Sequence, residues 1–269
     1  MPIIAVAGGT SNVGRTIVDA PIADGKHEVI VLSRNDHKVH TLISAIVMRT
    51  EENGAAEVNL IEAAGASQTT KRMVSSDWAA PMPSPDSAEG QKHPAAKLKN
   101  LAWKALEATT CLQDRTIFRC GVWLDYYVQH PALIKSHFTP FRLVVDTASN
   151  RAAIPGDGNT KVSFIHAADL RPMTWNEFIA LAEEVKGTKF GVVYDEVAKL
   201  ERFEVTELPS HVYVYQAIPK PFLQGFLAAF GLWFARGLYD LDEANALEKR
   251  LSAVKVRTAR ELFEMAWRT

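Results

Sequence analysis

The chain has few cysteines, no excess of charge of either sign and no apolar run long enough to cross a membrane. Its 269 residues include two cysteines, Cys111 and Cys120, which suit a reducing compartment and lack the spacing of a metal site. Thirty basic residues stand against thirty-one acidic ones, so the composition predicts neither a nucleic-acid surface nor a polybasic membrane patch. The remaining signal is an apolar content of 47%, enough for the core of one or two domains.

The stretch Phe222–Ala235 is strongly apolar, but Gln224 interrupts it and Arg236 follows it. It is shorter than the roughly 18 residues that a membrane-spanning helix needs, which favours a buried or pocket-lining helix. The apolar start of the chain is too short for a signal peptide and runs directly into glycines. We therefore expect a cytoplasmic protein without a membrane or nucleic-acid partner.

The first 35 residues carry the strongest functional signal. The apolar run Ile3–Ala7 leads into residues 8–14, GGTSNVG, and a second run, Val29–Leu32, ends at Ser33 and Arg34. A short strand that leads into a glycine-rich turn and a helix is typical of nucleotide-binding proteins, in which backbone amides approach a phosphate. NAD-binding chains usually carry an acid after the second strand, so the cation Arg34 favours the 2′-phosphate of NADP(H). The alternative is a solvated arginine at a strand end.

Apolar runs alternate with helical stretches through the first half of the chain. This order predicts an α/β fold of the Rossmann type, with a mostly parallel sheet and helices on both faces. Further strands are expected at Val39–Val47, at Lys71–Val74 with an end at residues 75–78, and at Thr116–Phe118. The expected helices are Val13–Ala23, Ala55–Ala64 and His93–Ala108.

The pattern changes in the second half. Arg151–Ile154 and Val162–Ile165 flank the turn sequence PGDG and predict a hairpin. Thr174–Glu177 is a capping-box sequence that predicts the start of a helix. We expect a nucleotide-binding domain over residues 1–150 and a smaller C-terminal α/β lobe over residues 151–269, interleaved with the sheet and covering the substrate.

Several motifs recur in the order found in one family. They are GGTSNVG, then LSR after the second strand, SDW at 76–78, Lys97 in its helix, TIFRCGVWLDYY at 116–127, AAIPGDGNTKVSF and TWNEF. With these motifs the chain resembles fungal members of the NmrA-like, isoflavone-reductase-like group of atypical short-chain dehydrogenases/reductases over most of its length. The resemblance implies a Rossmann domain with a small C-terminal lobe, NADP(H) as cofactor, and aromatic or polyketide secondary metabolites as substrates.

The resemblance also implies functional residues. The glycine pattern of the family is G-x-x-G-x-x-G; Gly8 and Gly14 match its ends, and Ser11 replaces its middle glycine. The usual Tyr-x-x-x-Lys pair is absent, because His93 stands four residues before Lys97. In the resembling reductases a lysine at the place of Lys97 contacts the nicotinamide ribose and serves in proton transfer, so Lys97 is the catalytic candidate. The alternative is a solvated helix lysine.

Small and polar residues at strand ends complete the expected cofactor site, because ligands of such folds bind at the carboxyl ends of the strands. Trp78 either stacks on the cofactor, closes the substrate pocket or packs in the core. His166 and Asp169 lack a third ligand, so we expect no metal. The residues expected to bind the cofactor are Gly8, Gly9, Thr10, Ser11, Asn12, Val13, Gly14, Ser33, Arg34, Asn35, Ser44, Ala45, Ser76, Asp77, Trp78 and Lys97.

Segments that the family possesses are missing from this chain. Only five residues separate Ser33 from Val39, where the family places a helix, a strand and a further helix, and a helix normally found near residues 168–172 is absent as well. The sequence therefore predicts a truncated sheet edge that leaves the adenine side of the cofactor poorly walled. Three interpretations fit: a shortened enzyme with a rearranged edge, a protein that binds its cofactor weakly or not at all, and a sequence from which coding segments were skipped.

Two functional hypotheses follow. The first is an NADP-dependent oxidoreductase that transfers hydride to or from a carbonyl, enone or similar group of a hydrophobic secondary metabolite. The second is a non-catalytic protein that binds NADP as a redox sensor, or a degenerate inactive member of the family. Lys97 together with a closed pocket distinguishes them, because a sensor needs neither. The sequence leaves the oligomeric state open.

Overall fold

The computed structural model describes residues 1–31, 38–91, 94–130, 133–134, 136–166, 169–241 and 257–268. The chain divides into two compact units, residues 1–119 and residues 120–269. This division comes earlier in the chain than the expected boundary at residue 150, because the strands that follow Arg119 pair with partners inside the second unit.

The first unit is built on a five-stranded sheet. Its strands are β1 (Ile3–Ala7), β2 (Glu28–Val31), β3 (Thr41–Ser44), β4 (Arg72–Ala79) and β5 (Asp114–Arg119), in the spatial order β2-β1-β3-β4-β5. Every pairing in this sheet is parallel. Parallel strands buried under helices are the expected arrangement of an α/β fold, so the predicted Rossmann-type sheet is confirmed.

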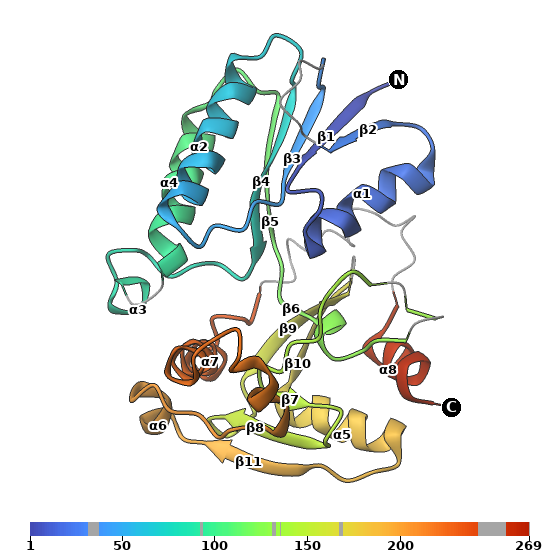
Figure 1. Cartoon of the computed structure of the whole chain (residues 1–269), viewed down its shortest axis with the longest axis vertical. Helices are drawn as coiled ribbons and strands as arrows, with labels where there is room; N and C mark the ends of the chain where they lie inside the picture. Colours follow the sequence, from blue (N-terminus) through green and yellow to red (C-terminus); the bar gives the residue numbers. More distant parts are fainter. Residues whose placement is uncertain are drawn as a thin grey trace. The chain divides into compact units, whose positions relative to one another are not determined.

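Helices cover both faces of this sheet (Figure 1). Helix α1 (Asn12–Asp24) lies on one face, and α2 (Glu51–Ala66) and α4 (Pro94–Ala108) lie side by side on the other, with the short α3 (Ala88–Gln91) preceding α4. Each large apolar side chain buried between these layers contributes about 1.5–3 kcal/mol to stability. The core on the α2 and α4 side includes Leu42, Ile61, Met73, Leu98, Ala102 and Leu106.

The strand β2 lies at the outer edge of the sheet. β2 pairs with β1 on one side, and among the described residues no strand lies on its other side. β2 and β3 lie on opposite sides of β1 in the sheet. Residues 32–37, between β2 and β3, lie outside the described ranges.

Two strands differ in length from the predicted ones. β3 ends at Ser44, before the predicted Val47, because its pairing with β4 stops one residue earlier. β4 continues past Ser75 to Ala79, with a shift in register between these two residues and a positive φ of 34° at Trp78. The SDW motif therefore lies in the irregular end of β4.

Helix α1 follows the predicted range Val13–Ala23 closely. Ser11 caps its start, and Gly25 ends it in the left-handed conformation with φ +68°. The helix continues through Pro21, and the N–H of Gly25 donates to the Pro21 carbonyl at 3.2 Å. Proline has no N–H to donate to the Ile17 carbonyl, which costs a helix interior about 3 kcal/mol.

The second unit contains two three-stranded sheets. One holds β6 (Val122–Trp123), β9 (Lys161–His166) and β10 (Asp169–Thr174), and the other β7 (Val145–Asp146), β8 (Arg151–Pro155) and β11 (Gly191–Asp195). The predicted hairpin of Arg151–Ile154 with Val162–Ile165 is wrong, since β8 pairs in parallel with β11 and β9 pairs antiparallel with β10. The turn forms, with positive φ at Gly156 and Gly158, but pairing with other strands places its two arms in different sheets.

Helix α5 begins at the predicted place, and both hydrogen bonds of the Thr174–Glu177 capping box are present. An aromatic core that includes Phe164, Trp175 and Phe178 packs beneath it. Among the helices that the structure describes, none, α7 included, combines the length and apolar character that crossing a bilayer requires. The helical segments of this unit are η1 (Leu124–Tyr126), α5 (Trp175–Lys186), α6 (Val197–Glu201), η2 (Pro209–Val214), α7 (Lys220–Ala235) and α8 (Ala259–Trp267).

Candidate functional site

The turn between β1 and α1 is packed so closely that two of its glycines are required. Gly8 has φ +73°, and a Cβ there would lie 2.7 Å from the Ala45 carbonyl oxygen. A Cβ on Gly14 would lie 2.1 Å from the Gly8 carbonyl oxygen. Both distances are shorter than any real Cβ contact. Only glycine therefore lets the turn lie this close to residue 45 and lets α1 start this close to the turn.

Ser11 fits this turn without displacing it. Its backbone is extended, and its hydroxyl accepts the N–H of Gly14 at 3.0 Å as the N-cap of α1. The N–H groups of Asn12 and Val13, the first of the helix, have no intrahelical acceptor. Together with the positive end of the helix dipole they make the start of α1 suited to an anion.

The ends of β3 and β4 are tied together by Trp78. Its indole N–H donates to the Ser44 carbonyl at 2.7 Å, and its ring stacks on Phe118 with centroids 5.4 Å apart. The hydroxyl of Ser76 donates to the Ile46 carbonyl at 2.8 Å. Trp78 therefore contributes to the packing at this edge, and its side chain is half-buried.

Beneath these strand ends lies a carboxylate that the sequence analysis did not select. Glu57 of α2 is fully buried, and it accepts hydrogen bonds from the hydroxyl of Ser44 at 2.5 Å, the hydroxyl of Ser75 at 2.8 Å and the N–H of Ser76 at 2.9 Å. Its position carried a signal, because Gly54, Glu57, Ile61 and Ala64 form the buried face of the helix. An acid at helical spacing among apolar residues indicates a buried polar network.

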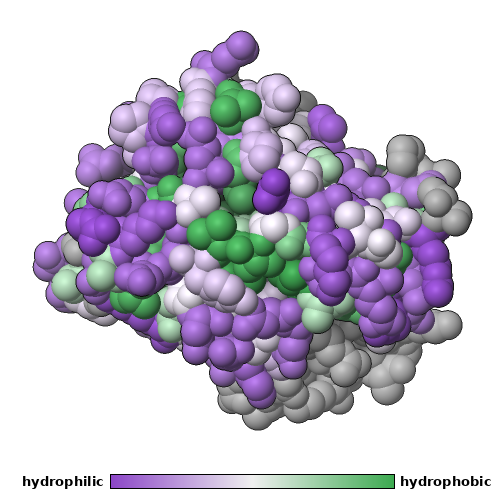
Figure 2. Space-filling model, turned by 90° about the horizontal axis from the view of Figure 1, so that it is seen from below, coloured by the Kyte–Doolittle hydropathy of each residue, from purple (hydrophilic) through white to green (hydrophobic). Residues whose placement is uncertain are grey.

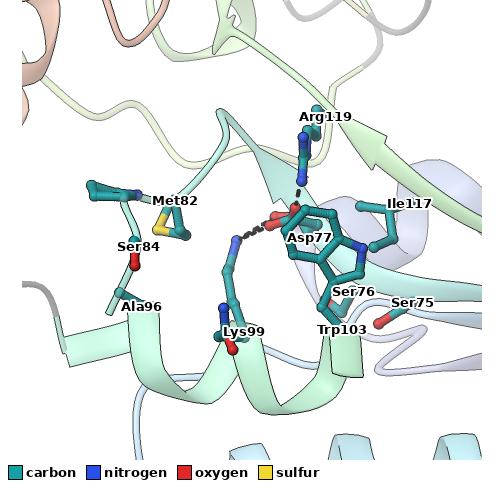
Figure 3. Close-up of a pocket in the computed structure, with 12 residues that line it drawn as sticks. Ser75, Ser76, Asp77, Met82, Ser84, Ala96, Lys99, Trp103, Ile117 and Arg119 are labelled. Atoms are coloured by element: carbon teal, nitrogen blue, oxygen red, sulfur yellow. Dashed lines mark hydrogen bonds and ion pairs between the residues drawn. The ribbon is translucent and has the colours of Figure 1, made fainter. Parts of the chain in front are cut away.

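A pocket of about 240 Å³ opens beside the carboxyl ends of β4 and β5 (Figure 3). The ammonium of Lys99 projects from α4 into it and donates to the carboxylate and the carbonyl of Asp77, both at 2.6 Å. Arg119 approaches the other side of that carboxylate at 3.8 Å, and its guanidinium lies 4.4 Å from the centre of the Trp103 ring. Ser75, Ser76, Met82, Asn100 and Ile117 also line the pocket.

Lys97, the expected catalytic residue, lies elsewhere. Its side chain is 71% exposed and makes a loose ion pair with Glu51, 3.8 Å away, and it does not line the pocket. The helix explains this: Leu98 and Ala102 mark the buried face of α4, and Lys97 falls on the opposite side, whereas Lys99 stands beside the buried face. The helical spacing of the apolar residues can be read from the sequence, and it places Lys99 nearer than Lys97 to the buried face of the helix.

The structure brings most of the other expected residues to one edge of the sheet. Residues 8–14 form the glycine turn, and Ser44, Ala45, Ser76, Asp77 and Trp78 lie at the ends of β3 and β4. Ser33, Arg34 and Asn35 lie outside the described residues, as does His93. Within the described ranges no three His, Cys, Asp or Glu side chains gather as a metal site would require.

In the second unit, Tyr127 at the end of the TIFRCGVWLDYY motif is packed in the aromatic core. Tyr127 is 3% exposed and makes edge-to-face contacts with Trp175 and Phe178. Burial raises the pKa of its phenol far above the usual value. A phenol held neutral in the aromatic core stabilises the fold and does not suit proton transfer.

The parallel sheet, the glycine turn and the polar pocket at the strand ends together define a Rossmann-type protein. No family model matches the chain. The oxidoreductase BOA1 of Botryotinia fuckeliana is 30% identical to it, over 88% of this chain and 89% of that protein. The oxidoreductase swnN of Metarhizium robertsii is 26% identical, over 80% of this chain and 83% of its own length.

Solved structures share the fold. A leucoanthocyanidin reductase–NADPH complex from Vitis vinifera aligns with a TM-score of 0.64 at 16% identity, covering 97% of this chain and 98% of that one. A crystal structure of isoflavone reductase aligns with a TM-score of 0.65 at 19% identity, covering 97% and 98%. The chain belongs to the isoflavone-reductase-like family of atypical short-chain dehydrogenases/reductases, as its motifs predicted.

Proposed function

We propose that the protein is an NADP(H)-dependent oxidoreductase that reduces or oxidises a carbonyl, enone or similar group of a hydrophobic aromatic or polyketide-type secondary metabolite. The observation that carries the proposal is Lys99, a lysine held in a pocket at the carboxyl ends of β4 and β5. The names of the relatives BOA1 and swnN as oxidoreductases support the reaction class.

The glycine turn fits a dinucleotide. The space that a Cβ on Gly8 or Gly14 would fill is taken by the protein's own backbone, so the glycines hold the turn tightly between residue 45 and the start of α1. The N–H groups of Asn12 and Val13 would hold the pyrophosphate, and Ser44 and Ala45 would lie under the ribose. When bound, NADP(H) supplies or accepts the hydride. The preference for NADP(H) over NAD(H) rests on Arg34 in the sequence.

Lys99 would act on the substrate side of this cofactor. Its ammonium carries three N–H donors, and within the described residues Asp77 accepts two of them. The third would bind a ribose hydroxyl or the reacting carbonyl oxygen and deliver a proton to that oxygen as charge develops on it. Asp77 would keep the ammonium in place, and we assign to Lys99 the role expected of Lys97.

The second unit, taken by itself, carries exposed apolar surface. Phe222, Phe226 and Phe230 follow one another at helical spacing along α7, and the first two are 65% and 38% exposed. In Figure 2 apolar side chains gather in the middle of the face shown, with hydrophilic ones around them. Apolar surface of this kind favours aromatic ligands.

A turnover assay tests the proposal. The purified protein is incubated with NADPH and a panel of aromatic ketones, enones and quinones, and the loss of NADPH fluorescence is followed. Substrate-dependent loss supports an oxidoreductase. Binding of NADPH and NADP+ with different affinities, with no loss for any member of the panel or in the reverse direction, would instead favour a redox sensor.

A further inference from the structure

The buried carboxylate of Glu57 has an unusual set of partners. Its three donors, the hydroxyls of Ser44 and Ser75 and the N–H of Ser76, are all neutral, and the side chain is fully buried. A buried carboxyl group is costly unless hydrogen bonds replace the water that it has lost. The burial of the Glu57 side chain therefore depends on these three hydrogen bonds, and the positions of Ser44, Ser75 and Ser76 depend on the Glu57 side chain.

The donors come from two neighbouring strands at the same edge of the sheet. Ser44 ends β3, and Ser75 and Ser76 lie near the end of β4, where the two strands are no longer joined by their own pairing, which stops at Ile43 and Val74. Beyond the ladder, the carboxyl group of Glu57 links the two strand ends, together with the hydrogen bonds that Trp78 and Ser76 donate to the Ser44 and Ile46 carbonyls.

The link reaches the glycine turn through the next residues. Ala45 directly follows Ser44, and its carbonyl oxygen is the atom nearest to a Cβ built on Gly8. The hydroxyl of Ser76 holds the Ile46 carbonyl. A shift of Ser44 or Ser76 would therefore move the backbone that lies against the turn. We call residues 44–46 and 75–78 the shelf.

We propose that Glu57 is a positioning residue that fixes the shelf and so sets the affinity for NADP(H). This inference rests on the proposed function, because the shelf matters only if the cofactor lies on it. Glu57 touches neither cofactor nor substrate; it acts through Ser44, Ser75 and Ser76.

Three variants and one control test the role of Glu57. In Glu57→Gln the amide oxygen can still accept from Ser75 and Ser76, and its NH2 group can donate to the hydroxyl of Ser44, so we expect an NADPH Kd within about threefold of wild type. In Glu57→Leu all three donors lose their acceptor, and we expect the Kd to rise by at least about tenfold. The double variant Ser44→Ala/Ser75→Ala should lie between them. Glu62→Leu, at an exposed position of the same helix, should leave the Kd unchanged.

The Kd is measured by NADPH fluorescence on protein shown to be folded by circular dichroism, together with amide hydrogen exchange read by mass spectrometry. We expect exchange in Glu57→Leu to rise in peptides that cover the shelf and to stay at the wild-type rate in peptides from residues 120–269. If Glu57→Leu does not fold, the serine double variant carries the same comparison.

A folded Glu57→Leu or serine double variant that binds NADPH as tightly as wild type would overturn the inference. So would exchange that rises uniformly through residues 1–119, because that is the signature of a general loss of stability. If the wild-type protein binds no NADPH, the proposed function fails. The exchange measured at the shelf in Glu57→Leu then still tests whether Glu57 holds the shelf in place.

Discussion

The ammonium of Lys99 is bound twice by Asp77, through the carboxylate and through the backbone carbonyl, each at 2.6 Å. The lysine comes from α4 and the aspartate from β4, so the pair joins the helix to the end of the strand (Figure 3). Both side chains are largely shielded, with 16% and 14% exposed, which keeps solvent from screening the interaction. The pair therefore fixes a cation at a defined place in the pocket.

The first prediction separates Lys99 from Lys97. Lys99→Ala should lower kcat by at least about 100-fold, because it removes the proposed proton donor, while the NADPH Kd stays within about tenfold. Lys97→Ala should leave both unchanged, since an exposed ion pair contributes less than about 1 kcal/mol. Steady-state kinetics on the best substrate of the panel measure both. Equal losses in the two variants would contradict the assignment.

The second prediction concerns the glycine turn. Gly14→Ala places a methyl group 2.1 Å from the Gly8 carbonyl, so we expect the free energy of unfolding to fall by about 2 kcal/mol or more and NADPH binding to be lost. Gly25→Ala is the matched control at the other end of the same helix. Its Cβ meets nothing within 4 Å, so only its φ of +68° costs about 1 kcal/mol and binding survives. Urea unfolding and NADPH titration distinguish the two.

Pro21 gives a prediction of the opposite sign. Pro21→Ala restores the N–H that can donate to the Ile17 carbonyl inside α1, so it should stabilise the protein by about 1 kcal/mol or more. The gain is smaller than the full penalty of proline because alanine also gives the unfolded chain more freedom. A thermal melt should show a higher Tm. A lower Tm would mean that the proline ring packs favourably where it stands.

The fourth prediction is a pH dependence in the second unit. The Asp146 carboxylate is fully buried and accepts from the N–H and hydroxyl of Ser210 at 2.9 and 2.6 Å. Burial raises the pKa of Asp146, but the hydrogen bonds from Ser210 and Ser149 together lower it by more. The pKa of Asp146 therefore lies below its ordinary value. A lowered pKa adds stability above the unfolded value of about 3.9, and that stability is lost as the pH falls through the folded value.

Asp146→Asn should therefore destabilise the protein by about 2 kcal/mol at neutral pH. The difference from wild type should shrink as the pH falls from about 4 toward the lowered pKa of folded Asp146, below which the carboxyl of the folded wild type is neutral too. Asp240→Asn, at an exposed position, is the control and should show no difference. Urea unfolding across the pH range measures all three proteins. A difference that does not change with pH would show that the charge of Asp146 is not what stabilises the fold.

Local patterns predicted the local structure well. The glycine turn at residues 8–14, helix α1 and the capping box at Thr174 depend on contacts within a few residues, and the structure confirms all three. The hairpin at residues 151–165 failed because a turn sequence does not determine which strands pair, and β8 and β9 find partners far along the chain. The pairing of strands that lie far apart in the chain cannot be read from the residues around the turn.

The site was predicted in part for the same reason. The strand-end residues could be placed because parallel strands share a carboxyl edge. Lys99 and Glu57 were missed, although each stands at a helical spacing that relates it to the buried face. Their hydrogen bonds to Asp77 and to the shelf serines cross from helix to strand, and that geometry emerges only when the helices pack on the sheet.

The most direct test of the central claim is a fluorescence titration of the wild-type protein with NADPH. The glycine turn and the shelf predict saturable binding, and the truncated edge beyond β2 predicts that it is weak, with a Kd between about 10 μM and 1 mM. Absence of saturable binding would contradict the cofactor assignment. A Kd of about 1 μM or below would show that the missing strand does not leave the adenine side open.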